Sequence, residues 1–178
     1  MTGSVLIAAP WSRRQVLAAA TATLALSSIA AWAVPAASTA PIDWSGLRLL
    51  DDQGDGPAHW ANLPVVVVFW ATWCPYCKRH NAHVEKLYQY SQRQGFRVLG
   101  VTDETDREKI ANSVLVQQIH FPIAMAATAF RAQFTSRRVL PLTCVVSAEG
   151  RLLQAIPGEM TLEDVMSLAA LAVAKPKI

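Results

Sequence analysis

VVVVFWATWCPYC, residues Val65–Cys77, joins a continuous apolar run to a pair of cysteines. Val65–Trp70 lacks the alternation of apolar and polar residues, which predicts a strand buried on both faces, as in a sheet covered by helices. Residues 77–94 carry apolar side chains at helical spacing, with polar residues between them. Cys74 and Cys77 therefore fall where a buried strand ends and a helix begins.

This position suits disulfide exchange, because a cysteine attacks as the thiolate. The unsatisfied N–H groups and the macrodipole of a helix start favour an anion at Cys74. Pro75 fits the first helical turn, where its missing N–H costs little. We expect Cys74 to be exposed and to attack a substrate disulfide, and Cys77 to resolve the mixed disulfide. The redox-active Cys74–Cys77 disulfide is the only redox group expected, without a separate cofactor or a metal.

A Cys-x-x-Cys pair can also be half of a zinc site, which is the alternative interpretation. Such a site needs a second pair of ligands at short spacing. Cys144 has no near partner in the sequence, and combining Cys77 with His80 leaves the fourth ligand unaccounted for. The strand before the pair and the helix after it favour redox chemistry. Cys144, inside another apolar run, is expected to be a buried, inert thiol.

Turn and cap signals divide the rest of the chain into alternating strands and helices. Thr105, which begins a capping box, and Thr161 are predicted to open two later helices. Hairpins are predicted at Gly46–Asn62 and at Leu142–Ile156, the second with Gly150 in its turn. The order β-α-β-α-(β)-α-β-β-α predicts an α/β fold without internal repeats.

The N-terminal segment has the features of an export signal. Arg13 and Arg14 precede an uncharged run, Val16–Val34, which is the layout of a secretory signal and a partial match to a twin-arginine signal. Ala31–Ala33 and Ser38–Ala40 both fit the cleavage pattern. An uncleaved anchor is the alternative, because the run is long enough to span a bilayer.

These features predict three parts: an export signal or membrane anchor at 1–33, a linker at 34–41 and a folded domain at 42–178. The net charge is +3, and removal of Arg13 and Arg14 leaves +1. This near-neutral domain lacks the clustered cations of a nucleic-acid-binding surface. Its length, roughly 140 residues, is enough for a sizeable core.

The predicted location is the periplasm, with an inner-membrane anchor facing the periplasm as the alternative. Disulfides persist there, so a dithiol that acts on protein disulfide substrates needs its own source of electrons. We expect a membrane electron-donor protein to supply them.

Phe69–Cys77 resembles the active-site segment of thioredoxin-like proteins, most closely the extracytoplasmic TlpA/ResA/CcmG group. Val139–Thr143 is similar to the segment in which that family holds a cis-proline beside the dithiol. The resemblance covers roughly residues 41–174. It implies a thioredoxin fold, with three α/β/α layers around a mixed sheet, here with an N-terminal hairpin. It also implies a cis Leu140–Pro141 bond and peptide docking against the Leu140 backbone.

Several residues around the pair are candidates for supporting roles. Trp73 is expected to form part of an apolar docking surface, and Trp70 to lie in the core. The Pro75-Tyr76 dipeptide is expected to tune the reduction potential of the pair.

Three positions depart from the family pattern. Val68 stands where cytoplasmic thioredoxins have a buried Asp, and His80 where many TlpA/ResA-like proteins have a Glu. Leu140 replaces a residue that is often small or β-branched. His80 is therefore a candidate acid/base, with an exposed helix histidine as the alternative. Asp103, which follows a strand predicted beside the site, is a second candidate for tuning Cys77, although a plain loop acid is the simpler interpretation.

The direction of electron flow is left open by the sequence. Resemblance to the TlpA/ResA/CcmG group implies a reductant of specific disulfides, such as those of apocytochrome c or of a copper-site protein. Cys-Pro-Tyr-Cys is also the glutaredoxin motif, which favours an oxidant or isomerase as the alternative. A non-catalytic copper or haem chaperone on the same scaffold is a third interpretation.

Overall fold

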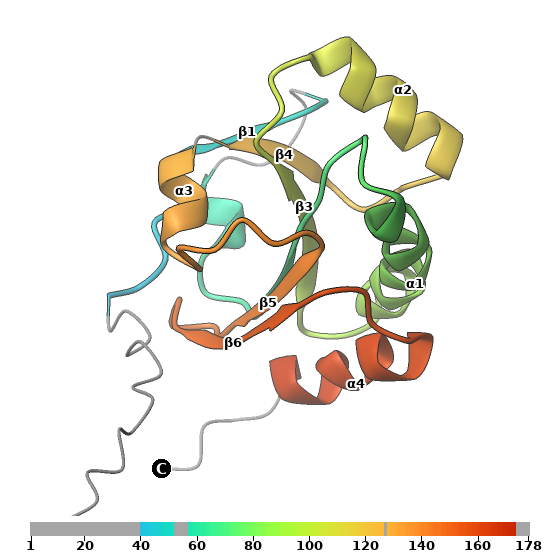
Figure 1. Cartoon of the computed structure of the whole chain (residues 1–178). Helices are drawn as coiled ribbons and strands as arrows, with labels where there is room; N and C mark the ends of the chain where they lie inside the picture. Colours follow the sequence, from blue (N-terminus) through green and yellow to red (C-terminus); the bar gives the residue numbers. More distant parts are fainter. Residues whose placement is uncertain (1–39, 52–56, 127, 174–178) are drawn as a thin grey trace, which may run out of the picture. The chain divides into compact units, whose positions relative to one another are not determined.

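A six-stranded mixed sheet forms the centre of the protein in the computed structural model, which describes residues 40–51, 57–126 and 128–173 (Figure 1). The strand order is β1-β4-β3-β2-β5-β6. The strands are β1 (Leu47–Leu49), β2 (Val65–Phe69), β3 (Arg97–Thr102), β4 (Ile123–Ala126), β5 (Leu142–Val146) and β6 (Leu152–Pro157). The helices are the short 3₁₀ helix η1 (Pro57–Trp60), α1 (Pro75–Ser91), α2 (Arg107–Gln117), α3 (Thr128–Ala132) and α4 (Leu162–Val173).

Strand β2 contributes side chains to both hydrophobic cores of the domain. All five of its residues are buried. Val66 and Val68 pack into one core, whereas Val65, Val67 and Phe69 pack into the other. Successive side chains of a strand point to opposite faces, so the apolar run without alternation matches a strand covered on both sides. The prediction of a doubly buried strand is confirmed.

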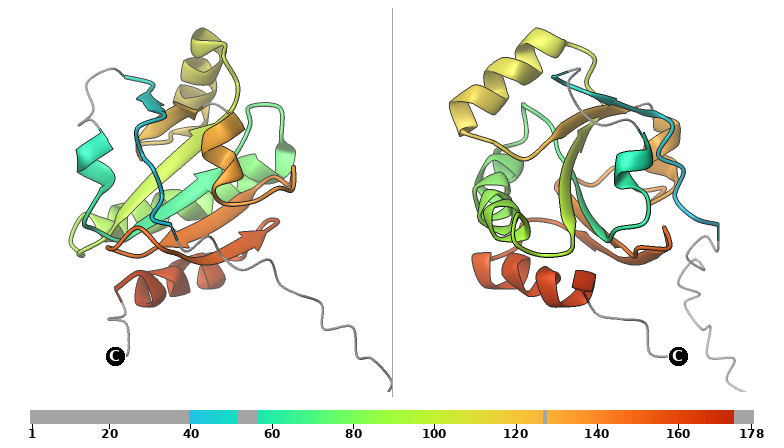
Figure 2. Two further views of the ribbon diagram at one scale, coloured as in Figure 1. Left: turned by 90° about the vertical axis from the view of Figure 1, so that its left-hand side faces the viewer. Right: turned by 180° about the vertical axis from the view of Figure 1, so that it is seen from behind.

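The two cores lie between the sheet and two layers of covering segments. Apolar side chains of α1 and α4 fill the core on one face. On the other face, α3, η1 and the segment that precedes β1 supply the covering residues (Figure 2). The predicted α/β/α layering around a mixed sheet is confirmed.

The pairing of the central strands determines which loops meet. β3 runs parallel to β2, with Val65 opposite Arg97, and also parallel to β4. β5 runs antiparallel to β2 on the other side, with Phe69 opposite Leu142. The loops that follow β2 and β3 therefore leave from the same edge of the sheet as the segment that enters β5.

The second predicted hairpin is confirmed, and so is the Thr161 cap. β5 and β6 pair antiparallel, and Gly150 has φ of 79°, a conformation that glycine adopts readily. The Thr161 hydroxyl accepts a hydrogen bond from the Asp164 amide at 3.2 Å at the start of α4.

Two other predictions about local structure are wrong. β1 pairs antiparallel with β4, and η1 follows β1 in the described part of the chain, so Gly46–Asn62 is no hairpin. β1 joins the sheet as an edge strand and takes its hydrogen-bond partners from β4, a pairing between distant segments that local turn signals could not indicate. Helix α2 is capped by Asp106, whose side chain accepts from the Lys109 amide at 3.0 Å, and not by Thr105.

The predicted export segment at 1–33 and most of the linker at 34–41 lie outside the described residues, and both stay predictions. Among the residues that the structure describes, no helix is long and apolar enough to cross a membrane.

Candidate active site

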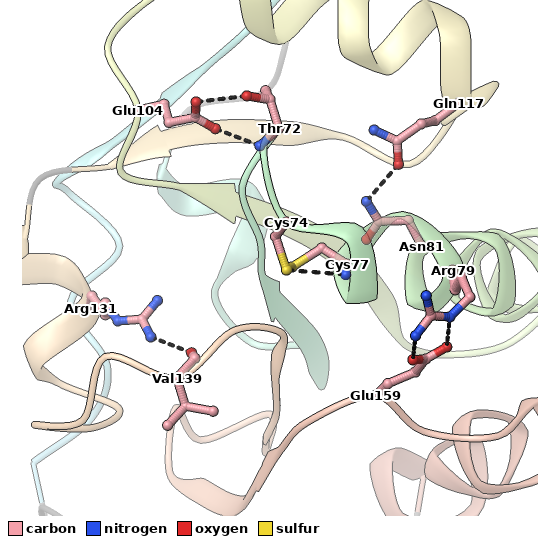
Figure 3. Close-up of a disulfide and its surroundings, with 10 residues drawn as sticks. All are labelled: Thr72, Cys74, Cys77, Arg79, Asn81, Glu104, Gln117, Arg131, Val139 and Glu159. Atoms are coloured by element: carbon pink, nitrogen blue, oxygen red, sulfur yellow. Dashed lines mark hydrogen bonds and ion pairs between the residues drawn. A yellow bond between two sulfur atoms is a disulfide. The ribbon is translucent and has the colours of Figure 1, made fainter.

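Cys74 is the N-cap residue of α1, and it forms a disulfide with Cys77 (Figure 3). The two Cα atoms are 5.2 Å apart. The Cys77 amide donates to the Cys74 sulfur at 3.2 Å, so sulfur takes the place that a Ser or Asp oxygen occupies in a common N-cap. Pro75 occupies the first helical turn, as the sequence predicts. A backbone donor of the helix start thus points at the sulfur, which favours the thiolate once the disulfide is reduced.

The two cysteines differ in exposure, and Cys74 is more buried than expected. Cys74 exposes 5% of its surface, whereas Cys77 exposes none. The expectation of an exposed Cys74 is wrong in degree, because the N-cap sulfur turns inward over the helix end. Its neighbour Trp73 is 68% exposed, and Trp70 is buried in the core.

Tyr76 is the second exposed aromatic beside the disulfide, at 57%. The guanidinium of Arg79 lies 5.0 Å from the centre of its ring. Arg79 in turn donates to both carboxylate oxygens of Glu159, at 2.8 and 2.6 Å. The Arg79 cation thus stabilises the position of the Tyr76 ring, and more than half of the Tyr76 surface stays accessible.

The second wall of the site is the segment that enters β5. The Leu140–Pro141 peptide bond is cis, as the resemblance implied. Leu140 is half-buried and packs against the core that contains both cysteines, and Pro141 is buried. The Pro141 carbonyl accepts from the Gly158 amide at 2.8 Å, which ties this wall to the end of β6.

Arg131 of α3 supports this wall from behind, a role that the sequence did not reveal. It is 9% exposed and its guanidinium lies 5.0 Å from the centre of the Phe69 ring. It donates to the Val139 carbonyl at 2.7 Å and to the Arg137 carbonyl at 3.3 Å. Burial lowers the pKa of Arg131, and the nearby Asp103 opposes that shift. Nothing in a five-residue helix marks one arginine as buried, so only the tertiary structure could identify it.

His80 is completely buried, so the alternative of an exposed histidine is wrong. Its Nδ1 accepts from the Met160 amide at 3.2 Å, which places the ring proton on Nε2. Nε2 is 2.8 Å from the Thr143 hydroxyl and donates to it. Burial, followed by the nearby His83, lowers the pKa of His80 to about 4, so the ring is neutral at pH 7. A role in proton transfer would require one of these two hydrogen bonds to break.

Glu104, rather than Asp103, contacts the loop that carries the disulfide. Asp103 is exposed, and its charge acts on Arg131. The Glu104 carboxylate accepts from the Thr72 amide at 2.6 Å and from the Thr72 hydroxyl at 2.8 Å. Burial acts to raise the pKa of Glu104, but hydrogen bonds from Thr72 and Lys109 outweigh it and lower that pKa. The sequence pointed to this loop through Asp103, whose tuning of Cys77 stays a prediction, and the adjacent Glu104 is the acid that bonds to Thr72.

The comparisons with known proteins agree with this geometry. The sequence matches the AhpC/TSA family over residues 58–154, more than half of the chain. The chain belongs to the AhpC/TSA family.

This AhpC/TSA protein is similar to thiol-disulfide oxidoreductases named ResA. It is 30% identical to ResA of Geobacillus kaustophilus (strain HTA426) and 28% identical to ResA of Geobacillus thermodenitrificans (strain NG80-2). Each match spans 139 residues and covers 75% of both proteins. Among solved structures, a thiol:disulfide interchange protein from Chlorobium tepidum TLS matches with a TM-score of 0.64 at 20% identity, over 76% of this chain and 99% of that one. The AhpC/TSA protein described here is a thiol-disulfide oxidoreductase with a thioredoxin fold.

The third cysteine of this oxidoreductase lies apart from the pair. Cys144 is free and completely buried in β5. Burial raises the pKa of the Cys144 thiol to about 12, and the charge of Arg131 offsets only part of that shift. The prediction of a buried thiol is confirmed. The described residues contain no group of three or more His, Cys, Asp or Glu side chains arranged to hold a metal ion.

Proposed function

We propose that this oxidoreductase is a dedicated disulfide reductant that works outside the cytoplasm, through attack by Cys74 and resolution by Cys77. The observation that carries the attacking role of Cys74 is its N-cap position, whereas the reductant direction is proposed from similarity to ResA proteins. Its sulfur accepts from the Cys77 amide and keeps some solvent contact, while Cys77 lies fully inside the helix turn. The attacking thiolate needs both stabilisation and access, and Cys74 is the member of the pair that has both.

The proposed reaction has two exchange steps. The Cys74 thiolate attacks one sulfur of a substrate disulfide, which forms a mixed disulfide and releases the other substrate sulfur as a thiolate. The Cys77 thiolate then attacks the Cys74 sulfur, which forms the Cys74–Cys77 disulfide and releases the second substrate sulfur. The substrate gains two electrons, the protein loses two, and the released thiolates take up protons from solvent. The redox-active disulfide is the only redox group that this cycle requires.

The proposed docking surface lies between the two walls. Trp73 and Tyr76 offer exposed aromatic faces next to Cys74. Among the described residues, neither backbone group of Leu140 has a hydrogen-bond partner, so an extended peptide could pair with it. Pro141, directly after Leu140, has no backbone N–H and so cannot donate to a neighbouring strand at this point.

Similarity to ResA proteins and the predicted N-terminal signal support the choice of a reductant in the periplasm. A reductant in an oxidising compartment must be re-reduced, so the proposal includes a membrane electron-donor protein. Protein disulfides of apocytochrome c or of a copper-site protein are the proposed substrates. Anchoring through residues 1–33 would keep the domain beside that donor.

The second candidate function is an oxidant or isomerase, and the helix start favours it in one respect. Stabilisation of the reduced form by the N-terminal end of α1 makes a dithiol more oxidising, and so can the Pro75-Tyr76 dipeptide. The reduction potential separates the two functions. Equilibration with glutathione buffers should give a value below about −200 mV for a reductant. A value above about −150 mV would contradict the proposal and favour the oxidant.

Substrate identity can be tested in the source organism with Cys77→Ala. This variant cannot resolve mixed disulfides, so it should retain its partners covalently on Cys74. Mass spectrometry of the trapped species should find haem-attachment or copper-site cysteines. Partners of unrelated kinds, captured without preference, would contradict a dedicated reductant.

A further inference from the structure

The carboxylate of Glu104 lies at the centre of a small cluster at the end of β3. It accepts three hydrogen bonds, from the Thr72 amide, the Thr72 hydroxyl and the Lys109 ammonium, the last at 2.9 Å (Figure 3 shows the first two). The Glu104 side chain is 14% exposed, so the carboxylate is largely shielded from water, whereas the Lys109 side chain is half-exposed. The Glu104 amide donates to the Thr102 hydroxyl at 3.2 Å, which fixes the backbone that carries the carboxylate.

The bonds to Thr72 hold the loop that presents the attacking sulfur. This loop is fixed at its start by a 3.0 Å bond from the Trp70 amide to the Val101 carbonyl. At its end, the Cys74 amide donates to the Ala71 carbonyl at 3.2 Å. Between these points, the carboxylate of Glu104 accepts from both the amide and the hydroxyl of Thr72, the residue two positions before Cys74.

A carboxylate is the group that fits this position. It has two oxygens, and one oxygen accepts the Thr72 amide while the other accepts the hydroxyl and Lys109. A glutamine in its place would offer one acceptor oxygen and turn a second donor toward groups that also donate. Charged hydrogen bonds of this kind are stronger than neutral ones, and leaving the Thr72 amide unpaired would be costly.

We propose that Glu104 is a positioning residue for disulfide exchange: through Thr72 it holds Trp73 and Cys74 in the geometry from which the Cys74 sulfur attacks. The proposal rests on the proposed attack by Cys74, and it is independent of the direction of electron flow. Lys109 of α2 also bonds to this carboxylate, through a half-exposed ion pair.

The test measures attack in a single step. Reduced Cys77→Ser protein is mixed with an excess of a disulfide-bonded model peptide, and mixed disulfide on Cys74 is followed by acid quench and mass spectrometry. In this background, Glu104→Gln should lower the rate of attack by about tenfold. Thr72→Val, which removes only the hydroxyl contact, should lower it by a smaller factor.

The two substitutions should not be additive. If Glu104 acts through Thr72, the double variant should be little slower than Glu104→Gln alone. A purely structural role would lower the melting temperature while leaving the attack rate unchanged well below it. Thr72→Val also guards against failure of Glu104→Gln to fold, because the same carboxylate is tested from its other side.

Two controls separate position from charge. Glu108→Gln removes an exposed carboxylate on α2 and should leave the rate unchanged. Lys109→Met changes the net charge in the opposite direction to Glu104→Gln but keeps both Thr72 bonds, so it should have a small effect. Opposite, equal effects of Glu104→Gln and Lys109→Met would overturn the proposal, because they would indicate long-range charge.

The Cys77→Ser protein without further substitutions separates failure of the proposed function from failure of the positioning role. If Cys77→Ser forms no mixed disulfide at Cys74, attack by Cys74 fails as a function and the positioning role fails with it. If Cys77→Ser reacts and Glu104→Gln reacts at the same rate, only the positioning role is overturned.

Discussion

The start of α1 and the middle of β5 each carry a cysteine, yet the two thiols have opposite surroundings. Cys74 caps a helix, and its sulfur accepts a backbone N–H. Cys144 lies in a strand whose five residues are all buried, where burial raises the pKa of its thiol to about 12. We therefore expect the reactivity of a cysteine in this fold to depend on its burial and on whether backbone donors face the sulfur.

A buried side chain of α1 bonds directly to β5. His80, one helical turn beyond Cys77, bonds to Thr143, the residue before Cys144. The buried, neutral imidazole of His80 thus connects α1, which begins at the reactive cysteine, to β5, which contains Cys144. The contrast between the regions suggests substitutions at the start of α1, at His80 and around β5.

The largest effect is expected from Cys74→Ser. A serine hydroxyl keeps the N-cap hydrogen bond but is a poor nucleophile toward a disulfide, so exchange should fall by about a thousandfold or more. The reaction is followed as reduction of a disulfide-bonded peptide by the pre-reduced protein. Retention of about a tenth of wild-type activity would show that another sulfur attacks.

The link between the regions should show in the pH dependence of stability. Burial lowers the pKa of His80 from 6.5 to about 4, so the unfolded chain takes up the proton first as the pH falls. The contribution of the neutral ring is complete above about pH 6.5 and is lost as the pH falls through about 4, a change of about 3 kcal/mol in the free energy of unfolding.

Urea unfolding at several pH values checks this expectation. Between pH 6.5 and 5 the slope should belong to His80, because the carboxylates whose pKa values are lowered, such as Glu104 and Glu159, lose their contributions only in more acid solution. His80→Gln should flatten the curve in this range. An unchanged slope in His80→Gln would show that the ring is not buried as described.

A smaller effect is expected from Arg131→Met, which removes the support behind the segment that enters β5. Arg131→Met keeps the packing against Phe69 but leaves the Val139 carbonyl without its donor, which should cost about 2 kcal/mol of stability. Exchange should slow as well, because the segment before Pro141 loses its support. Arg151→Met, at an exposed position with one long ion pair, is the matched control and should change neither quantity. Equal behaviour of the two variants would argue against a supporting role for Arg131.

The smallest effect is expected from Cys144→Ala. Exchange should stay within about twofold of wild type, and the loss of a buried sulfur should lower stability by about 1 kcal/mol. The same peptide assay and urea unfolding measure both. A large loss of exchange would place Cys144 in the reaction and remove the contrast with Cys74.

Much of the site could be predicted from sequence because its signals are local. The apolar run of β2, the cysteine spacing and Pro75 together indicate a helix start with a reactive sulfur. The cis bond at Pro141 followed from resemblance. Other features depend on contacts between distant segments: β1 pairs with β4, Glu104 after β3 bonds to Thr72 after β2, and Arg131 is buried against the segment it supports. A sequence pattern carries no record of such contacts.

The central claim, that the helix start makes Cys74 the attacking sulfur, can be tested directly by alkylation of the fully reduced protein. Brief exposure to iodoacetamide at pH 7, followed by peptide mapping, gives the rate at each of the three cysteines. Cys74 should react faster than Cys77 and at least about a hundredfold faster than Cys144. Labelling of Cys77 before Cys74, or of Cys144 at a similar rate, would contradict the account.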